Sequence, residues 1–474
     1  MEDLNHTAKR EGKKFWSEFY NHRYSRNEYQ LNEPELRTFL QDEGFRIFKN
    51  NVIRLAGNIS EKISPEDIFL HCLKFIESFG DPELEAIFLK RGETLLLKSR
   101  AIILGLSQCE IPPLRDSENL SYKCYKNGIV VVEKDQDFKI IPYEDAPGFV
   151  WENLIIKRDF KLVSEEQLGK GDFSNFVENV TNNEEHFDSV CSALGYLLHG
   201  HKDQRKPIAI LINDENIIDE GKPEGGSGKG LLVKGLSKIV EKASYNGKNA
   251  DFTKDKFAYQ NVRDTTQILF IDDVPRNFNF EALFSALTDD LPVEKKHQQT
   301  IVLPFEESPK FVITTNYTIN GNSSSYKRRR FDIFLNNFYN AEHTPTDDFG
   351  KEFFHGWSEN EWQLFDYFMM TCLRLYLALG LRRYDDRTWA LKMLKNETSA
   401  DFVELMDEQF SEKMIQYDYA SVRQNLIMRY GEKYYFLNKD YKTIVDWVSR
   451  YASFNGLIFK KGRKTKGISF TFKL

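Results

Sequence analysis

The glycine-rich segment PEGGSGKGLLVKGLSKIV, at residues 223–240, has the residue types that bind phosphate. Gly225, Gly226 and Gly228 leave the backbone free to curl, so that successive N–H groups point inward. Lys229 follows at the start of an amphipathic helix, whose N-terminus favours anions. Loop, lysine and helix together predict a P-loop that holds a nucleotide. The alternative interpretation is a flexible turn that carries an ordinary surface lysine.

Two carboxylates and an amide follow at the ends of two apolar segments. ILFIDDV, at 268–274, contains Asp272 and Asp273 near its end, and KFVITTNY, at 310–317, reaches Asn316. In a parallel sheet such side chains emerge at the carboxyl edge, where ligands bind. One carboxylate there can hold Mg²⁺ through water, the other can orient or deprotonate the attacking water, and the amide can hydrogen-bond the γ-phosphate. The alternative is a pair of solvated strand ends.

A run of four cations, KRRRF at 327–331, follows these segments and precedes an apolar strand, FDIFL. Such a run is usually a solvated face. After a nucleotide-binding core, however, one of its arginines can reach a phosphate bound to a neighbouring subunit. An arginine supplied in trans accelerates phosphoryl transfer by about 10³-fold or more.

The elements that must position these groups alternate between strands and helices. The short apolar run PIAILIN, at 207–213, is typical of a buried parallel strand, and the order strand, glycine-rich turn, helix, strand, strand is an α/β pattern. Ahead of this core, Ser64 and Pro65 predict the start of a helix. The predicted domains are a helical N-terminal domain at 1–115, a small strand-rich section at 116–163, the nucleotide-binding core at 164–345, a helical segment at 346–400 and a C-terminal domain at 401–474.

Composition narrows the class of protein. The net charge of −7 gives no global signature of nucleic-acid binding, but residues 420–474 hold twelve Lys or Arg against three Asp or Glu. Phosphate contacts outside the core are therefore expected in this tail. No apolar run approaches the ~20 residues that span a bilayer, and no secretory signal is evident. The five cysteines form no paired framework, which favours a reducing cytoplasm, and the lack of a long apolar run argues against a membrane partner.

These motifs, in this order and within residues 221–330, resemble those of a superfamily 3 helicase, an AAA+ ring motor of the poxvirus-type and phage or plasmid primase–helicase branch. Lys229 with its glycines matches Walker A, Asp272 and Asp273 match Walker B, and Asn316 matches motif C. The arginine finger matches Arg329 or Arg330, and Arg330 is favoured because it directly precedes the apolar strand.

Between Walker B and motif C, PVEKKHQQTIVLPF, at 292–305, resembles the motif B′ hairpin, whose tip carries a lysine and often a histidine into the ring channel. Lys296 and His297 match these positions, with Lys295 beside them. A cation and an imidazole at a hairpin tip can bind a phosphate and stack on a sugar or base. The alternative is a surface hairpin with incidental lysines.

The resemblance implies an ATP-dependent DNA helicase that uses ATP and Mg²⁺ and translocates as a ring on single-stranded DNA. It implies a role in replication of a virus, phage or mobile element, in the cytoplasm of a bacterial host cell or at a viral replication site. Asp272 would support Mg²⁺, Asp273 would act on water, and Asn316 would sense the γ-phosphate. The implied partners are single-stranded DNA, further copies of the chain in a homo-hexamer, and a separate primase or polymerase. The implied ATP-binding residues are Gly225, Gly226, Ser227, Gly228, Lys229 and Gly230.

The flanking segments show weaker resemblances. Residues 116–163 resemble the strand-rich unit ahead of poxvirus-type helicase cores, and residues 401–474 resemble a winged helix. The segment KKGRKTKG would form its basic wing, with DNA contacts from Lys460, Lys461, Arg463 and Lys464.

One position departs from the family pattern. The residue after Lys229 is Gly230, whereas a P-loop usually has Ser or Thr there, whose hydroxyl binds Mg²⁺. Ser227 precedes the lysine and is poorly placed to substitute. The gap favours a second hypothesis, a nucleotide-switched DNA-binding ring or loader with little or no hydrolysis. A third, an ATP-driven remodeller of proteins, is disfavoured by the B′-like hairpin and the basic tail.

Overall fold

The computed structural model describes residues 14–167, 169–214, 226–249, 255–296, 299–317, 319, 324–384, 390–391, 394–395, 397–411, 416–438, 441–464 and 467–473. They form two compact units. The N-terminal unit comprises the described residues up to Leu162 together with His199–His201, and the second unit comprises the rest. Within the described parts of both units, no helix is long and apolar enough to cross a membrane.

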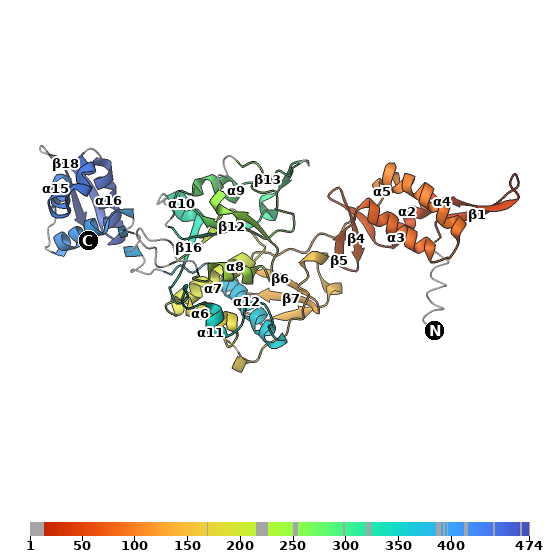
Figure 1. Ribbon diagram of the computed structural model, residues 1–474, viewed down its shortest axis with the longest axis horizontal. Coiled ribbons are helices and arrows are strands. Elements are labelled where there is room, and N and C mark those ends of the chain that lie inside the picture. Colours follow the sequence, from red (N-terminus) through yellow and green to blue (C-terminus); the bar gives the residue numbers. More distant parts are fainter. Residues whose placement is uncertain are drawn as a thin grey trace. The chain divides into compact units, whose positions relative to one another are not determined.

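The N-terminal unit mixes short strands with helices (Figure 1). A two-stranded hairpin comes first, and a four-stranded sheet of order β3-β4-β5-β9 and a three-stranded meander, β6-β7-β8, follow. The elements are β1 (Trp16–Asn21), β2 (Arg26–Leu31), α2 (Glu33–Asp42), β3 (Phe45–Phe48), β4 (Asn51–Ala56), β5 (Ile59–Lys62), α3 (Pro65–Glu77), α4 (Pro82–Gly92), the π-helical η1 (Glu93–Lys98), α5 (Ala101–Leu104), β6 (Leu120–Tyr125), β7 (Gly128–Glu133), β8 (Lys139–Ile141) and β9 (Val150–Trp151).

The prediction of a helical domain at 1–115 requires correction, because five strands lie between residues 16 and 62. The antiparallel pair β3–β4 depends on a close approach at Gly44, where an added Cβ would lie 2.2 Å from the carbonyl oxygen of Leu55. After β5, the helical spacing in the sequence agrees with the helices α3 and α4. Ser64 caps α3 in a capping box with Asp67, and Pro65 occupies the first turn, as the sequence predicts.

The second unit contains a five-stranded sheet whose paired strands all run parallel, in the order β11-β12-β15-β10-β16. The elements of this core are α6 (Asp172–Asn179), α7 (Glu184–Leu198), β10 (Ala209–Asp214), α8 (Lys229–Leu236), β11 (Lys242–Asn246), β12 (Ile268–Val274), α9 (Phe284–Thr288), β13 (Leu291–Val293), β14 (Ile301–Leu303), β15 (Lys310–Thr315), α10 (Ser324–Arg329), β16 (Arg330–Leu335), α11 (Pro345–Phe349) and α12 (Glu359–Leu379).

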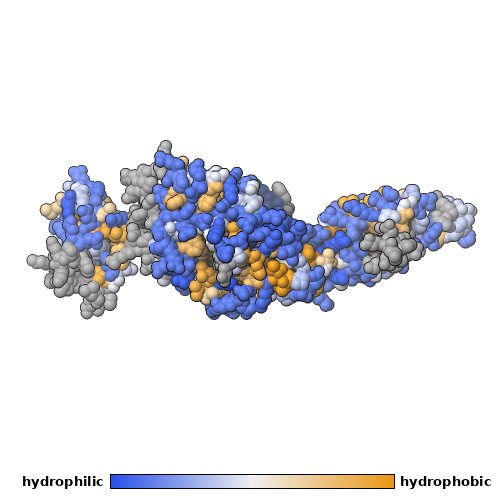
Figure 2. All heavy atoms as spheres, turned by 90° about the horizontal axis from the view of Figure 1, so that it is seen from below, coloured by the Kyte–Doolittle hydropathy of each residue, from blue (hydrophilic) through white to orange (hydrophobic). Residues whose placement is uncertain are grey.

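Both faces of this sheet are covered, as parallel sheets require. Ala209 and Leu211 share one buried cluster with Leu283 and Leu287, which flank and belong to α9. On the α8 side the helices approach closely, because an added Cβ at Gly235 would lie 2.5 Å from the Phe173 ring of α6. Hydrophilic residues cover most of the surface visible in Figure 2, with smaller apolar areas between them. The sheet therefore presents its carboxyl edge, not its faces, to ligands.

Residues beyond 390 have a hydrophobic core of their own, which includes Phe402, Leu426 and Val448. Three helices precede a C-terminal hairpin, and the three-stranded sheet has the antiparallel order β17-β19-β18. The elements are α14 (Ala400–Ser411), β17 (Gln416–Asp418), α15 (Tyr419–Tyr430), α16 (Tyr441–Phe454), β18 (Ile458–Lys464) and β19 (Gly467–Lys473).

Candidate nucleotide site

The glycine-rich loop leaves β10 and enters α8. Gly225 lies outside the described residues, whereas Gly226 and Gly228 both have left-handed φ angles, of 120° and 94°. An added Cβ at Gly228 would lie 2.6 Å from Cζ of Phe176, so both the backbone and the packing require glycine there. Gly230, by contrast, is exposed and would have no atom within 4 Å of an added Cβ.

Lys229 begins α8 and is held by three side chains. Its Nζ forms an ion pair with Asp214, the last residue of β10, and donates to Oδ1 of Asn316 over 2.7 Å. A weaker contact of 3.3 Å joins it to Oγ of Ser227. Only 12% of the lysine side chain and 15% of the Asp214 side chain are exposed. The ammonium group is therefore fixed beside the loop by a carboxylate that the sequence analysis did not identify.

The carboxylates of β12 are set by a local irregularity of the strand. The pairing register with β15 shifts between Ile271 and Val274, and Asp273 has a φ of 53°. The Asp273 N–H donates to Oγ1 of Thr314 over 2.9 Å, and that hydroxyl donates to Oδ1 of Asp272 over 2.8 Å. A left-handed φ at a non-glycine residue is strained, and such strain is typical of functional sites. The bulge aims two successive carboxylates at one edge.

Asn316 joins the two halves of the site. Its Nδ2 donates to Oδ1 of Asp273 over 3.1 Å, while its Oδ1 accepts from Lys229. Oδ2 of Asp273 lies 2.8 Å from Nζ of Lys248, and this hydrogen bond raises the pKa of the lysine. Asp214, Lys229, Asn316, Asp273 and Lys248 thus form one continuous chain of polar contacts.

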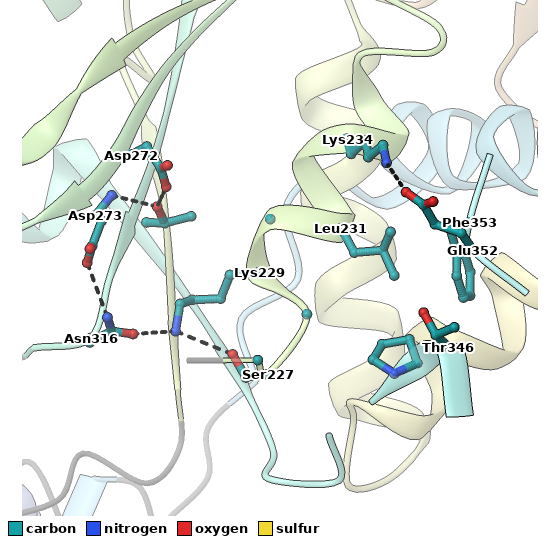
Figure 3. A pocket seen from close by; sticks show the side chains of 15 residues that line it. Ser227, Lys229, Leu231, Lys234, Asp272, Asp273, Asn316, Thr346, Glu352 and Phe353 are labelled. Carbon is teal, nitrogen blue, oxygen red and sulfur yellow. Dashed lines mark hydrogen bonds and ion pairs between the residues drawn. The ribbon is translucent and has the colours of Figure 1, made fainter. Parts of the chain in front are cut away.

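Beside this chain lies a cavity of about 490 Å³, which is within the usual range for small-ligand sites. Its lining has two ends (Figure 3). Lys229, Asp272, Asp273 and Asn316 lie at one end, and Leu231, Lys234, Thr346, Glu352 and Phe353 lie at the other. The first end is polar and suits phosphates. The second combines the apolar side chains of Leu231 and Phe353 with the carboxylate of Glu352, which lies 3.6 Å from Nζ of Lys234.

The arginine run lies at the junction of α10 and β16. Arg330 donates to Oδ2 of Asp332 over 3.0 Å and to the carbonyl oxygen of Ile319 over 2.8 Å, and only 12% of its side chain is exposed. The guanidinium of Arg329 lies 4.6 Å from the Phe284 ring. Arg328 is exposed. The two arginines singled out from the sequence are therefore engaged within their own chain.

The proposed DNA-contacting residues lie on two hairpins. β13 and β14 pair antiparallel from Leu291↔Leu303 to Val293↔Ile301, and Lys295 and Lys296 lie in the connection between them. Lys296 is exposed, with Nζ 5.8 Å from the Phe257 ring, whereas His297 lies outside the described residues. The basic residues of the C-terminal tail lie on β18, which is paired with β19: Lys460, Lys461, Arg463 and Lys464.

The structure brings Lys229, Asp272, Asp273 and Asn316 together and adds two residues that the sequence analysis missed. Asp214 directly follows the apolar run at 207–213, and the rule that ligands meet the carboxyl ends of parallel strands would have drawn attention to it. Lys248 follows β11, and no local pattern marks it.

The parallel sheet with flanking helices, its glycine-rich turn and its acidic strand end are consistent with an α/β core of the P-loop type. A family of unknown function, DUF5906, matches residues 221–330. No curated protein matches the chain in sequence.

Solved structures show weak similarity to the chain. The C-terminal region of NrS-1 is 14% identical, with 93% of this chain and 98% of that chain covered and a TM-score of 0.41. The JCV helicase is 15% identical, with 45% of this chain and 53% of that chain covered and a TM-score of 0.25. Because both scores are low, a function for this chain has to be inferred from its own residues.

Proposed function

We propose that the chain is an ATP-dependent DNA helicase of the superfamily 3 type, which works as a homo-hexameric ring on single-stranded DNA during replication of a virus, phage or mobile element. The observation that carries this proposal is the chain of contacts that joins Lys229, Asn316 and Asp273 beside the cavity. A phosphate-binding lysine, a polar sensor and a strand-end carboxylate are the parts that phosphoryl transfer to water requires.

Each residue has a role in this proposal. Lys229 and the loop amides bind the phosphates, and Asp272, oriented by Thr314, holds Mg²⁺. When bound, Mg²⁺ neutralises charge on the phosphate oxygens. Asp273 accepts a proton from, or orients, the attacking water, and Asn316 couples that carboxylate to Lys229. The residues present fit a nucleotide and a metal ion, apart from the hydroxyl that Gly230 lacks.

The arginine that acts on the nucleotide of a neighbouring subunit belongs to the run at residues 328–330, and a mixing experiment identifies it. Arg330 can reach a neighbouring subunit only if it leaves Asp332 and Ile319, whereas the exposed Arg328 has no such requirement. In the test, Arg328, Arg329 and Arg330 are replaced by alanine one at a time, and each variant protein is mixed with the Lys229→Ala protein. A variant that lacks only the trans arginine regains hydrolysis in mixed rings, because its intact nucleotide site then faces the intact arginine of a Lys229→Ala subunit.

DNA binding is assigned to both hairpins. Lys295, Lys296 and His297 would line the channel of the ring, and the order of helices and strands after residue 400 supports a winged-helix-like domain whose wing is the hairpin β18–β19. A separate primase or polymerase is proposed as a further partner.

The test is ATP hydrolysis with and without single-stranded DNA, together with unwinding of tailed duplexes. Lys229→Ala should abolish hydrolysis, and Lys157→Ala is the matched control, because Lys157 is 68% exposed and forms a surface ion pair with Glu152 at 3.4 Å. Hydrolysis that survives Lys229→Ala, or that DNA does not stimulate, would rule out the motor.

Gly230 supports a second candidate, a nucleotide-switched ring or loader. Because space is open around Gly230, Gly230→Thr can add the missing hydroxyl without a clash. If the chain is a motor, the wild-type protein hydrolyses ATP and Gly230→Thr changes the rate of hydrolysis only modestly. A switch assembles on DNA with ATP but turns over only after the substitution. The two functions are thus distinguished by the wild-type protein and one variant.

A further inference from the structure

The hairpin β1–β2 extends beyond the helices of the N-terminal unit (Figure 1). It forms a two-stranded sheet of its own and is anchored at its base. Trp16 is buried, with its ring 5.0 Å from that of Phe79, and the Tyr29 hydroxyl donates to Asp81, the N-cap of α4. Isolated hairpins are only marginally stable, so these contacts fix the base while the tip stays accessible.

Aromatic side chains gather at this tip. Phe19, Tyr20 and Tyr24 are 43%, 52% and 60% exposed, although rings of this size normally bury most of their area. Two of these rings have local contacts within the turn. Tyr20 lies edge-on to His22 at 5.0 Å, and the ring of Tyr24 lies beside the guanidinium of Arg23, while a backbone hydrogen bond of 3.2 Å from Tyr24 to Asn21 closes the turn. Exposed apolar groups held in place in this way mark a binding surface.

The charge of the tip is of one sign. The residues from 19 to 26, FYNHRYSR, include Arg23 and Arg26 and no Asp or Glu. The guanidinium of Arg23 lies 5.6 Å from the Tyr24 ring, and Arg26 begins β2 opposite Asn21. The nearest acid along β2, Glu28, accepts a hydrogen bond of 2.8 Å from Asn21 at the base of the turn. Cations interleaved with exposed rings suit a polyanion with flat, stackable groups.

We propose that the tip of the hairpin β1–β2 binds single-stranded nucleic acid, with bases stacked on Tyr20 and Tyr24 and a phosphate bound by Arg23. Bases in a duplex are already stacked on their neighbours, so an exposed ring gains contact mainly from a single strand. This site requires neither the nucleotide site nor the hairpin β13–β14. It gives the N-terminal unit a function of its own, which is to bind a single strand independently of the second unit.

The test uses the full chain without ATP, and fluorescence anisotropy of a labelled oligodeoxythymidine and of a duplex over a series of salt concentrations. Tyr20→Ala combined with Tyr24→Ala should weaken single-strand binding by about 30-fold or more, because each stacked base contributes about 1 kcal/mol or more and the two losses add. Tyr20→Phe with Tyr24→Phe keeps the rings and should restore it. Arg23→Ala should lower the magnitude of the salt slope by about 0.7.

The matched control is Leu70→Ala with Leu89→Ala, because these side chains are 49% and 45% exposed on helices of the same unit. Wild-type affinity in the double tyrosine variant, or an equal loss for duplex and single strand, would overturn the proposal. So would cross-linking that detects a protein at the tip while single-strand affinity is unchanged. Lys229→Ala separates the two proposals, because it should abolish hydrolysis and leave the contribution of the tip intact.

Discussion

Replacing Gly228 with alanine tests whether the loop has the shape described. Its φ is 94°, and the new Cβ would lie 2.6 Å from Cζ and 2.7 Å from Cε2 of Phe176. That ring cannot retreat easily, because it is fully buried and its centroid lies 5.7 Å from those of both Tyr339 and Phe353. Either the loop or the packing of α6 has to change.

Two effects determine how much free energy Gly228→Ala costs. A side chain in the left-handed region costs roughly 1–2 kcal/mol. Forcing an extra methyl into a packed site costs about 1–3 kcal/mol. If both apply to the loop conformation that binds phosphate, nucleotide affinity falls by roughly 30-fold at the lower bound, since about 1.4 kcal/mol corresponds to a factor of ten. If the packing changes instead, the same free energy is lost from unfolding.

Two measurements on each variant separate these outcomes: the affinity for a fluorescent ATP analogue, and the free energy of unfolding in urea. Gly230→Ala is the control, since nothing lies within 4 Å of its Cβ and it occupies the second position of α8. In a helix the change from glycine to alanine stabilises by up to about 1 kcal/mol. Equal behaviour of the two variants in both assays would refute the described geometry.

Four further outcomes follow from the contacts. Asp214→Asn should tighten ATP binding, because the carboxylate that pairs with Lys229 competes with phosphate, and should destabilise the nucleotide-free protein by about 1–3 kcal/mol in urea unfolding. Thr314→Val should lower kcat about 10- to 100-fold in an ATPase assay with little change in affinity, because Asp272 loses its orienting hydroxyl. Burial lowers the pKa of Lys202 from 10.5 to about 8, so the unfolded chain binds more protons between these values. Stability of the wild type relative to Lys202→Met should therefore rise with pH across that window, by up to about 3 kcal/mol, and a flat difference in urea unfolding would contradict this. Removing Mg²⁺ with EDTA should weaken ATP binding measured by anisotropy as well as stop hydrolysis, and unchanged affinity would contradict the charge balance of the cavity.

The core residues of the site could be predicted because each belongs to a local pattern. The glycines and Lys229 form a loop motif, and Asp272 and Asn316 end apolar strands, which the parallel sheet brings to one edge. Lys248 could not be predicted. It reaches Asp273 because Gly247 lets the chain approach β12, where an added Cβ would lie 2.4 Å from the carbonyl oxygen of Asp272. Such a contact depends on tertiary packing and not on spacing.

The same distinction explains the N-terminal unit. The capping box of Ser64 and Asp67 is complete within four residues, so the sequence predicts the start of α3. The strands β3 and β4, FRIF and NVIRLA, are short, and apolar and polar residues do not alternate regularly in either of them. Their pairing is decided by the turn at Lys49 and Asn50, both with positive φ, and by the close approach at Gly44. Neither feature is visible in a hydrophobic pattern.

The charge balance of the cavity bears on what can bind there. Among the described residues that line it, two lysines, Lys229 and Lys234, face three carboxylates, those of Asp272, Asp273 and Glu352. Each lysine is also paired with a carboxylate, Lys229 with Asp214 and Lys234 with Glu352. A triphosphate therefore enters a site whose cations are already compensated, and its added charge needs a further cation close by. Asp273 is paired with Lys248, but Asp272 leaves negative charge at the phosphate end, so a divalent ion there reduces the repulsion at binding as well as at hydrolysis. Because residue 230 is glycine, the ion lacks one hydroxyl ligand. The negative charge that favours binding of the ion is still there.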